Sequence, residues 1–98
     1  MNILCVVAHP DDTEILCAGT LIRYAKEGHQ VTIAVFTDGS MGDAVVAPAE
    51  LKKIREAETR AAAAVIDAKV IWGGVMDEHV FPDREQRLIM IDILREAD

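Results

Sequence analysis

Three short apolar runs, each followed by a longer segment with helical periodicity, restrict the fold of this chain more than any other feature. The first run is rich in Val, Ile and Leu without alternating polar residues, which is typical of a strand covered on both faces. A helix between two strands gives the chain the length that a parallel crossover needs. The pattern therefore predicts strands at 2–8, 30–36 and 69–72 and helices at about 14–27, 49–67 and 84–96.

The order of these segments also predicts how the strands are arranged. Crossovers between parallel strands are right-handed in almost all proteins. We therefore expect an α/β, Rossmann-like fold of three layers, with a parallel sheet in the strand order 3-2-1. This βαβαβα unit corresponds to the N-terminal part of a larger domain of that kind, and no repeat, linker or low-complexity segment divides residues 1–98.

Polar residues and glycine mark the ends of the predicted helices. Asp12 or Thr13 is placed to cap the first helix, and Gly28 suits its end. Asp83 precedes the last helix in the same way. The apolar stretch RLIMIDIL within that helix predicts deep burial or a subunit contact.

The net charge argues against several classes of partner. With 10 basic and 17 acidic residues the formal charge is −7, and no basic stripe offsets it locally. Such a chain is poorly suited to nucleic acid or to anionic membrane surfaces. The run Ile3–Ala8 is too short for a signal peptide or a membrane span, so we expect a cytoplasmic protein. Cys5 and Cys17 fit no metal or redox spacing and are predicted to be buried, reduced thiols.

The segment His9–Asp12, HPDD, is the strongest candidate for a functional site. It follows the first strand, at the end where ligands bind in sheets of this kind. One interpretation is a metal site, because an imidazole and a carboxylate three positions apart in a turn can converge on a divalent ion. A cation also stabilises the clustered negative charge. One carboxylate then binds the ion and its neighbour moves protons, while Pro10 stiffens the turn.

Two other interpretations are open for the same segment. A phosphate loop is disfavoured because no G-x-G-x-x-G follows the strand and the acids would repel pyrophosphate. Alternatively, Asp11 and Asp12 only cap the helix, which explains one carboxylate but not His9 and Glu14 as well. Nucleophilic catalysis has little support, because there is no G-x-S-x-G motif and neither cysteine lies beside a histidine or a helix N-terminus.

Several motifs resemble the LmbE/PIG-L family of zinc-dependent N-acetylglucosaminyl deacetylases. AHPDDTEI followed by CAGTL is similar to the family signature A-H-P-D-D-x-E and GGT, with Ala18 in place of the first glycine. Three further segments are similar, in this order, to the second strand and its loop, the helix with R-x-x-E and the L-G-x-x-D segment: GHQVTIAVFTDGSMGD, ELKKIREAETRAAAAVI and GGVMDEHVF. Together these resemblances span almost all of the 98 residues.

The resemblance implies an activity and a set of roles. The activity is metal-dependent hydrolysis of the N-acetyl group of an N-acetylglucosamine-type sugar or glycoconjugate, which gives a free amine and acetate. His9 and Asp12 correspond to metal ligands and Asp11 to the general base, while Arg55 and Asp77 correspond to residues that hold the substrate. The implied ion is Zn²⁺, and Fe²⁺ accepts the same ligand types.

The resemblance also implies a ligand that these residues lack. The family has a further histidine ligand in an H-x-D-H segment after a fourth strand, and His29 and His79 match neither histidine of that segment. Catalytic zinc sites usually have three protein ligands. We therefore expect the isolated 98-residue chain to be inactive. The alternative is a non-catalytic fragment that folds and self-associates.

The predicted strand order places the first strand at an apolar edge of the sheet. Exposed edges of this kind tend to pair with another strand. We therefore predict a homo-oligomer, or pairing with a segment that supplies the missing strand.

Three candidate residues also have ordinary structural explanations. Arg55 and Glu58 lie three positions apart on a helix, where an exposed ion pair is common. Asp38, in TDGSMGD, fits turn chemistry better than a role beside a metal. Asp77 follows the third strand, but acidic loops are commonplace.

Overall fold

The structure, a computed structural model, describes residues 1–98 as three parallel strands and four helices. Strands and helices alternate as the sequence predicts, so the α/β class and the βαβαβα order are confirmed. In chain order the elements are β1 (Asn2–Val7), α1 (Asp12–Leu16), α2 (Ala18–Lys26), β2 (Gln30–Thr37), α3 (Pro48–Ala64), β3 (Lys69–Val75) and α4 (Arg84–Glu96).

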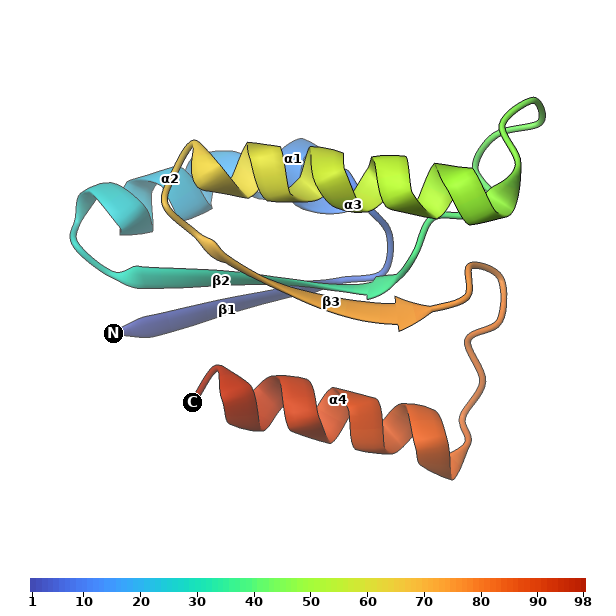
Figure 1. Cartoon of the computed structure of the whole chain (residues 1–98). Coiled ribbons are helices and arrows are strands. Elements are labelled where there is room, and N and C mark those ends of the chain that lie inside the picture. Colours follow the sequence, from blue (N-terminus) through green and yellow to red (C-terminus); the bar gives the residue numbers. More distant parts are fainter.

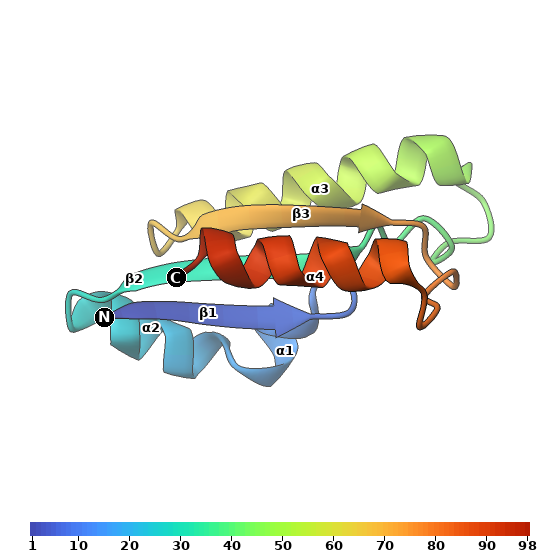
Figure 2. The same ribbon diagram turned by 90° about the horizontal axis from the view of Figure 1, so that it is seen from below.

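The sheet has the spatial order β1-β2-β3, which is the predicted order 3-2-1 seen from the other edge (Figure 2). All pairings are parallel, with Val6 opposite Ala34 and Ala34 opposite Ile71. Every residue of β2 after Gln30 is buried, because this strand is paired on both sides and covered on both faces. The carboxyl ends of the three strands consequently lie at one edge of the sheet, where ligands bind in folds of this kind.

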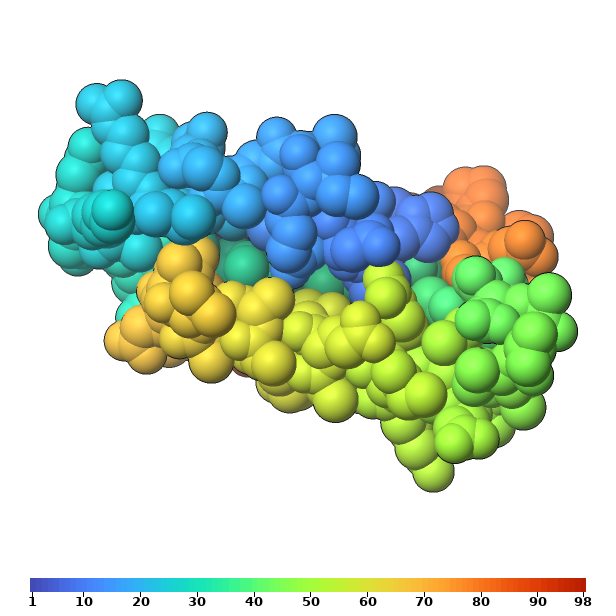
Figure 3. Space-filling model, turned by 90° about the horizontal axis from the view of Figure 1, so that it is seen from above, coloured from blue at the N-terminus to red at the C-terminus, as the bar shows by residue number.

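One face of the sheet is covered by α1, α2 and α3 (Figure 1). Seen from above, α1 and α2 in blue and α3 in green and yellow form two ridges that lie side by side (Figure 3). The side-chain period of two along β2 points alternate residues toward these helices. The buried core on this face consists of three such β2 residues and one residue from each ridge: Val31, Ile33, Val35, Leu21 and Ala63.

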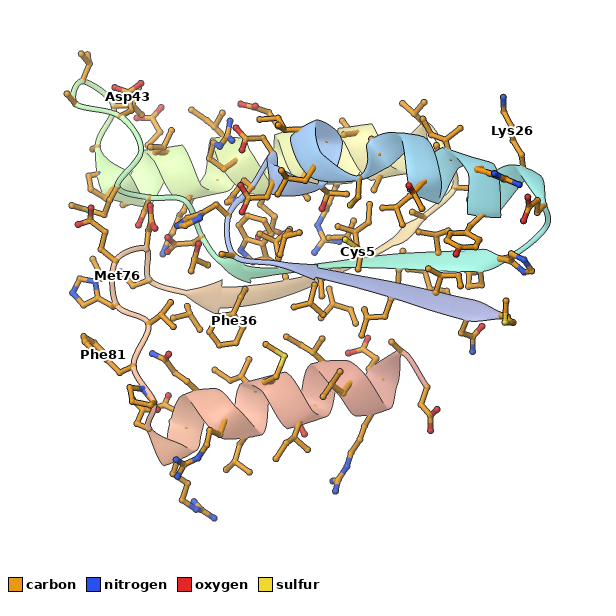
Figure 4. All side chains as sticks on the ribbon, turned by 180° about the vertical axis from the view of Figure 1, so that it is seen from behind. Cys5, Lys26, Phe36, Asp43, Met76 and Phe81 are labelled. Atoms are coloured by element: carbon orange, nitrogen blue, oxygen red, sulfur yellow. The ribbon has the colours of Figure 1, made fainter.

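The other face of the sheet is covered by α4 (Figure 1). Ala34 and Phe36, which alternate with the β2 residues of the first face, pack there with Val75 and Ile93. Figure 4 shows Phe36 between the sheet and α4, and Cys5 on the side of the other helices. The two faces of β2 therefore build separate apolar clusters.

α4 begins at the predicted residue but is less buried than predicted. Asp83 accepts a hydrogen bond from the Gln86 N–H at 2.8 Å and so caps the helix. Ile93 is the only buried residue of α4, and apolar side chains such as Leu88 and Leu94 are exposed. Deep burial is thus wrong for these residues, and a subunit contact of α4 stays a prediction. No helix of the structure is both long enough and apolar enough to cross a membrane.

The single helix predicted at residues 14–27 is wrong, because the structure has two helices that meet at Cys17. The Cys17 backbone, at φ −147° and ψ 11°, lies outside the helical region. The break places the Cys17 Sγ 3.5 Å from the Cys5 Sγ on β1. Burial, and then the neighbouring Cys17, raises the pKa of the Cys5 thiol from 9.0 to about 11. Both cysteines are free thiols and are partly buried.

β3 extends to Val75, whereas the sequence predicted its end at Trp72. The predicted strand at 69–72 leaves the glycine pair at residues 73 and 74 outside the strand. A Cβ atom at Gly73 would lie 2.6 Å from the Phe36 carbonyl oxygen, so the strand requires glycine for the close approach of two backbones. The pairing of β2 with β3 becomes irregular at this end, directly before the loops of the candidate site.

Candidate active site

Three loops meet at the carboxyl edge of the sheet and form the candidate site. The Thr37 hydroxyl donates to the Ala8 carbonyl oxygen at 2.7 Å, and the Asp38 N–H donates to the Val75 carbonyl oxygen at 2.9 Å. The end of β2 is thereby joined to the ends of both neighbouring strands. The loops and the start of α3 line a cavity of about 360 Å³. Four of the five predicted site residues lie in its wall: His9, Asp11, Arg55 and Asp77.

The carboxylates of the HPDD loop do not cap the helix that follows them. Asp11 occupies the N-cap position of α1 in a left-handed conformation, at φ 76°, and its side chain makes no capping hydrogen bond. Asp12 accepts a hydrogen bond from the His9 backbone N–H at 3.0 Å instead. The interpretation that both acids only cap the helix is therefore wrong. Left-handed backbone is uncommon in residues other than glycine and clusters at functional sites.

The His9 ring lies between two carboxylates that differ in exposure. Nδ1 is 3.6 Å from Asp12 Oδ2, and Nε2 is 3.2 Å from Asp77 Oδ1. The side chains of His9 and Asp12 are 53% and 31% exposed, whereas that of Asp77 is 9% exposed. His9 and Asp12 thus present an imidazole nitrogen and a carboxylate toward solvent, while Asp77 contacts the ring from the buried side.

Asp77 and Asp38 are buried, and backbone amides surround their carboxylates. Asp77 accepts hydrogen bonds from the N–H groups of Glu78, at 3.0 Å, and Met41, at 3.2 Å. Asp38 Oδ1 accepts from the N–H groups of Ser40, at 2.9 Å, and Asp77, at 3.0 Å. Burial raises the pKa of the Asp38 carboxyl, but the hydrogen bonds from Ser40 and Asp77 outweigh burial. The pKa of Asp38 therefore lies below its ordinary value of 3.8.

The sequence favours an ordinary turn for Asp38 over a role beside a metal, and the turn accounts for one of the two hydrogen bonds that the carboxylate accepts. The bond from the Ser40 N–H is turn chemistry, whereas the bond from the Asp77 N–H joins the loops after β2 and β3. A usable signal was present in the sequence. A carboxylate directly after a buried strand lies at the ligand-binding edge of a parallel sheet.

Arg55 reaches from α3 to the HPDD loop. Its Nη2 donates to Asp11 Oδ2 at 2.9 Å and to the Pro10 carbonyl oxygen at 3.2 Å, and its Nη1 donates to Glu58 at 3.1 Å. The ion pair that helical spacing predicts is present, and the same guanidinium also joins α3 to Asp11. Gly39, at φ +67°, packs against this loop, since a Cβ atom there would lie 2.9 Å from Pro10 Cγ.

The structure gathers no group of three or more His, Cys, Asp or Glu side chains that could hold a metal ion. His9 and Asp12, the two residues predicted to bind a metal, lie close together, with His9 Nδ1 3.6 Å from Asp12 Oδ2. The His79 ring contacts the Asp77 carbonyl oxygen at 2.9 Å through Nδ1, and the His29 ring contacts the N-terminal amino group at 3.1 Å. Neither of these histidines forms a group with His9 and Asp12 that could hold a metal ion.

A second cavity, of about 380 Å³, lies between β1 and α4. Its lining is mainly apolar and includes Val6, Phe36, Phe81 and Met90. No carboxylate or histidine contributes to its wall. Of these two cavities, only the first contains the carboxylates and the histidine that acid–base or metal chemistry would require.

Comparison with known proteins identifies the family. Residues 4–98 match the PIG-L family, described as GlcNAc-PI de-N-acetylase. The chain is 45% identical over 51 residues to the 1D-myo-inositol 2-acetamido-2-deoxy-alpha-D-glucopyranoside deacetylase of Saccharomonospora viridis, and 32% identical over 97 residues to the diacetylchitobiose deacetylase of Thermococcus kodakarensis. The structure superimposes on N,N'-diacetylchitobiose deacetylase from Pyrococcus horikoshii with a TM-score of 0.88 and 33% identity.

These matches cover different shares of the two chains. They include 52%, 96% and 96% of this chain, but only 18%, 36% and 36% of the respective relatives. The chain therefore spans about a third or less of the length of these proteins. The resemblance inferred from the sequence is confirmed, and this chain belongs to the PIG-L family of GlcNAc-PI de-N-acetylases.

Proposed function

We propose that this chain provides the catalytic edge of a metal-dependent N-deacetylase. The enzyme hydrolyses the N-acetyl group of an N-acetylglucosamine-type sugar or glycoconjugate and releases a free amine and acetate. The observation that carries the proposal is the arrangement of His9, Asp11 and Asp12. These three polar side chains meet at the ligand-binding edge of the sheet, and helix capping does not explain them. Membership of a deacetylase family and the names of the relatives support the same activity.

The spacing of His9 and Asp12 fits two ligands of one ion. Ligand atoms at about 2.0–2.1 Å from a tetrahedral Zn²⁺ lie about 3.4 Å from each other. His9 Nδ1 and Asp12 Oδ2 are 3.6 Å apart, and both side chains reach solvent. Imidazole and carboxylate suit Zn²⁺ and also Fe²⁺. A divalent ion bound there supplies Lewis acidity, which polarises the acetamide carbonyl and lowers the pKa of a water molecule.

Asp11 is our candidate for the general base. Its side chain is 56% exposed and lines the cavity, and its strained backbone turns it away from the helix N-terminus. A carboxylate that binds no ion itself can accept the proton of the attacking water. The Arg55 guanidinium, 2.9 Å from Asp11 Oδ2, holds this carboxylate toward the cavity.

Arg55 and Asp77 complete the cavity wall, and we propose that both border the bound sugar. Arg55 carries N–H groups suited to sugar hydroxyls, and its side chain is 24% exposed. Asp77 lies deeper, where the substrate reaches it only at the bottom of the cavity.

The remaining ligand of the ion comes from outside these 98 residues in this proposal. Two ligands are fewer than a catalytic zinc site usually has, so the isolated chain binds the ion weakly and turns over no substrate. β1 pairs only with β2, which leaves one apolar edge free. A second copy or another segment that pairs there covers this edge. Multi-angle light scattering of the isolated chain at high concentration tests the first option, and a clean monomer counts against it.

Acetate release tests the proposed activity. The complete gene product that contains these residues is freed of metal, reloaded with Zn²⁺ and given N-acetylglucosamine and N-acetylated chitobiose. We expect equal amounts of acetate and free amine, dependent on Zn²⁺. Asp11→Asn should retain the zinc and lose turnover, whereas the matched charge removal Asp92→Asn, at an exposed position of α4, should retain both.

Two results would contradict the proposal. Zinc-loaded protein that releases no acetate from any N-acetylated sugar removes the deacetylase activity. Equal turnover of wild type and Asp11→Asn removes the general-base assignment and leaves the activity standing.

A further inference from the structure

Asp77 has the features of a residue that orients His9. Its carboxylate is nine-tenths buried, and its Oδ1 is 3.2 Å from His9 Nε2. In metal sites a ligating histidine almost always donates its other ring N–H to a carboxylate, a carbonyl or water, and this contact fixes the tautomer and the ring. The inference rests on the proposed metal site, because only an ion at His9 gives the ring orientation a catalytic purpose.

The two ring nitrogens of His9 differ in the hydrogen-bond acceptor that lies nearest to each of them. The Nδ1 atom is 3.6 Å from Asp12 Oδ2, which is too long for a hydrogen bond. Asp12 Oδ2 already accepts from the His9 backbone N–H at 3.0 Å. The Nε2 atom has the shorter contact, because it lies 3.2 Å from Oδ1 of the buried Asp77 carboxylate. The ring proton therefore belongs on Nε2, and the lone pair of Nδ1 points toward the solvent-facing side.

Asp77 is held firmly enough to set the position of the ring. Its two oxygens accept from the Glu78 and Met41 N–H groups, and its own N–H donates to Asp38. Two hydrogen bonds thus hold the carboxylate, and a third holds the backbone of Asp77 at the end of β3. His9 is mostly exposed and has no comparable set of contacts, so the ring follows the carboxylate.

We propose that Asp77 is a positioning residue that keeps the proton of His9 on Nε2 and leaves Nδ1 free, beside Asp12, to bind the ion. Two backbone N–H groups and the His9 ring together occupy three of the about four acceptor positions of the Asp77 carboxylate, which leaves little capacity for sugar hydroxyls. The main effect of Asp77 is therefore on the metal site, and its effect on substrate binding is secondary.

The test is the tautomer of His9 in the metal-free chain. The ¹⁵N shifts of its ring nitrogens, recorded at alkaline pH where imidazoles are neutral, distinguish Nε2–H from Nδ1–H. We expect wild type to contain one tautomer, Nε2–H, and Asp77→Asn to contain a mixture. Asp38→Asn is the matched control, because it removes a buried charge from the same loops, retains the oxygen that accepts from Ser40 and Asp77, and does not touch the ring.

Zn²⁺ affinity gives a second readout that does not need turnover. Loss of a residue that orients a ligand weakens metal binding by about 10–100-fold. We expect this loss in Asp77→Asn, measured by competition with a chromophoric chelator, and a much smaller change in Asp38→Asn. Equal zinc affinity in wild type and Asp77→Asn overturns the proposal.

The wild-type spectrum decides the matter even if Asp77→Asn does not fold. A dominant Nδ1–H tautomer, or a mixture, in wild-type protein overturns the proposal. So does an unchanged tautomer in a folded Asp77→Asn variant. Because the spectrum is taken without metal or substrate, it is independent of acetate release. A confirmed tautomer in an enzyme that releases no acetate refutes only the proposed function.

Discussion

Two pairs of aspartates at the carboxyl edge of the sheet differ sharply from each other. Asp11 and Asp12, the exposed pair, have side chains that are 56% and 31% exposed, and neither side chain caps α1. Asp38 and Asp77 are buried, and each accepts two backbone N–H groups. Identical side chains thus face solvent in one loop and accept backbone hydrogen bonds in a buried position in the other two.

The comparison teaches that backbone amides separate the two roles. A buried carboxylate is stable only when donors replace the water it has lost. Loops after β2 and β3 supply such donors to Asp38 and Asp77. The HPDD loop instead leaves the oxygens of Asp11 to Arg55 and to solvent. We expect substitution of Asp38 to affect mainly stability and substitutions in the exposed pair to affect chemistry, whereas substitution of Asp77, which also contacts His9, should affect both.

The largest effect is expected within the exposed pair. In the complete enzyme, Asp12→Ala removes a proposed ligand and should abolish both zinc retention and turnover. Asp11→Asn should retain zinc and lower kcat by about 10²–10⁴-fold, the usual contribution of a general base. Elemental analysis together with steady-state kinetics separates the two variants. Loss of zinc from Asp11→Asn would assign that residue to the ligands instead.

In the buried pair, Asp38→Ala should lower the free energy of unfolding by about 2–3 kcal/mol, because the N–H groups of Ser40 and Asp77 lose their acceptor in a buried site. Urea unfolding of the isolated chain measures this loss. Asp11→Ala is the matched control and should change stability much less, since exposed ion pairs contribute little. Equal losses in the two variants would erase the distinction between the pairs.

Gly39, in the loop after β2, packs against Pro10 of the HPDD loop. Gly39→Ala should therefore affect both stability and the proposed metal site. A Cβ atom there would lie 2.9 Å from Pro10 Cγ, and the backbone at φ +67° strains any L side chain. We expect a loss of about 1–2 kcal/mol in unfolding free energy, together with weaker zinc binding. Gly28 also has a positive φ, of +89°, but open space surrounds it. Gly28→Ala therefore measures the cost of the backbone strain without the contact with Pro10. Unchanged zinc affinity in Gly39→Ala would show that Pro10 can move freely.

The smallest effect is expected in the loss of stability at acidic pH. The pKa of Asp38 is lowered in the folded chain, so its stabilising contribution is complete above 3.8 and is lost as pH falls through the folded pKa. Asp38→Asn should flatten the fall of stability in this range. Part of the fall should persist, because backbone hydrogen bonds from Val45 and Val46 also lower the pKa of Asp43. Thermal melts recorded at stepwise lower pH provide the comparison, and parallel curves would contradict it.

The order of helices and strands was predictable because the patterns behind it are local. Apolar runs and helical periodicity depend on neighbouring residues, and the handedness of crossovers then gives the strand order. The break at Cys17 and the extension of β3 through Gly73 were not predictable in the same way. The first depends on where the Cys17 thiol packs on β1, and the second on how closely two backbones approach.

The residues of the candidate site differ in the same way in how well the sequence alone could identify them. His9, Asp11 and Asp12 stand next to one another in the sequence and were identified from residue chemistry. Arg55 and Asp77 came from the resemblance alone, because a contact between residues 11 and 55 leaves no trace in either segment. Asp38 was predicted only as a turn, since its bond to the Asp77 N–H spans 39 positions.

The strand order has a consequence for how the chain assembles. The spatial order β1-β2-β3 is also the order along the chain, so each strand pairs with the strand that precedes it. No strand has to insert between two others that are already paired. Closing the distant contacts of a parallel sheet is slow, and here only one crossover has to close at a time. The loops of the candidate site are completed last, when β3 places Asp77 beside His9.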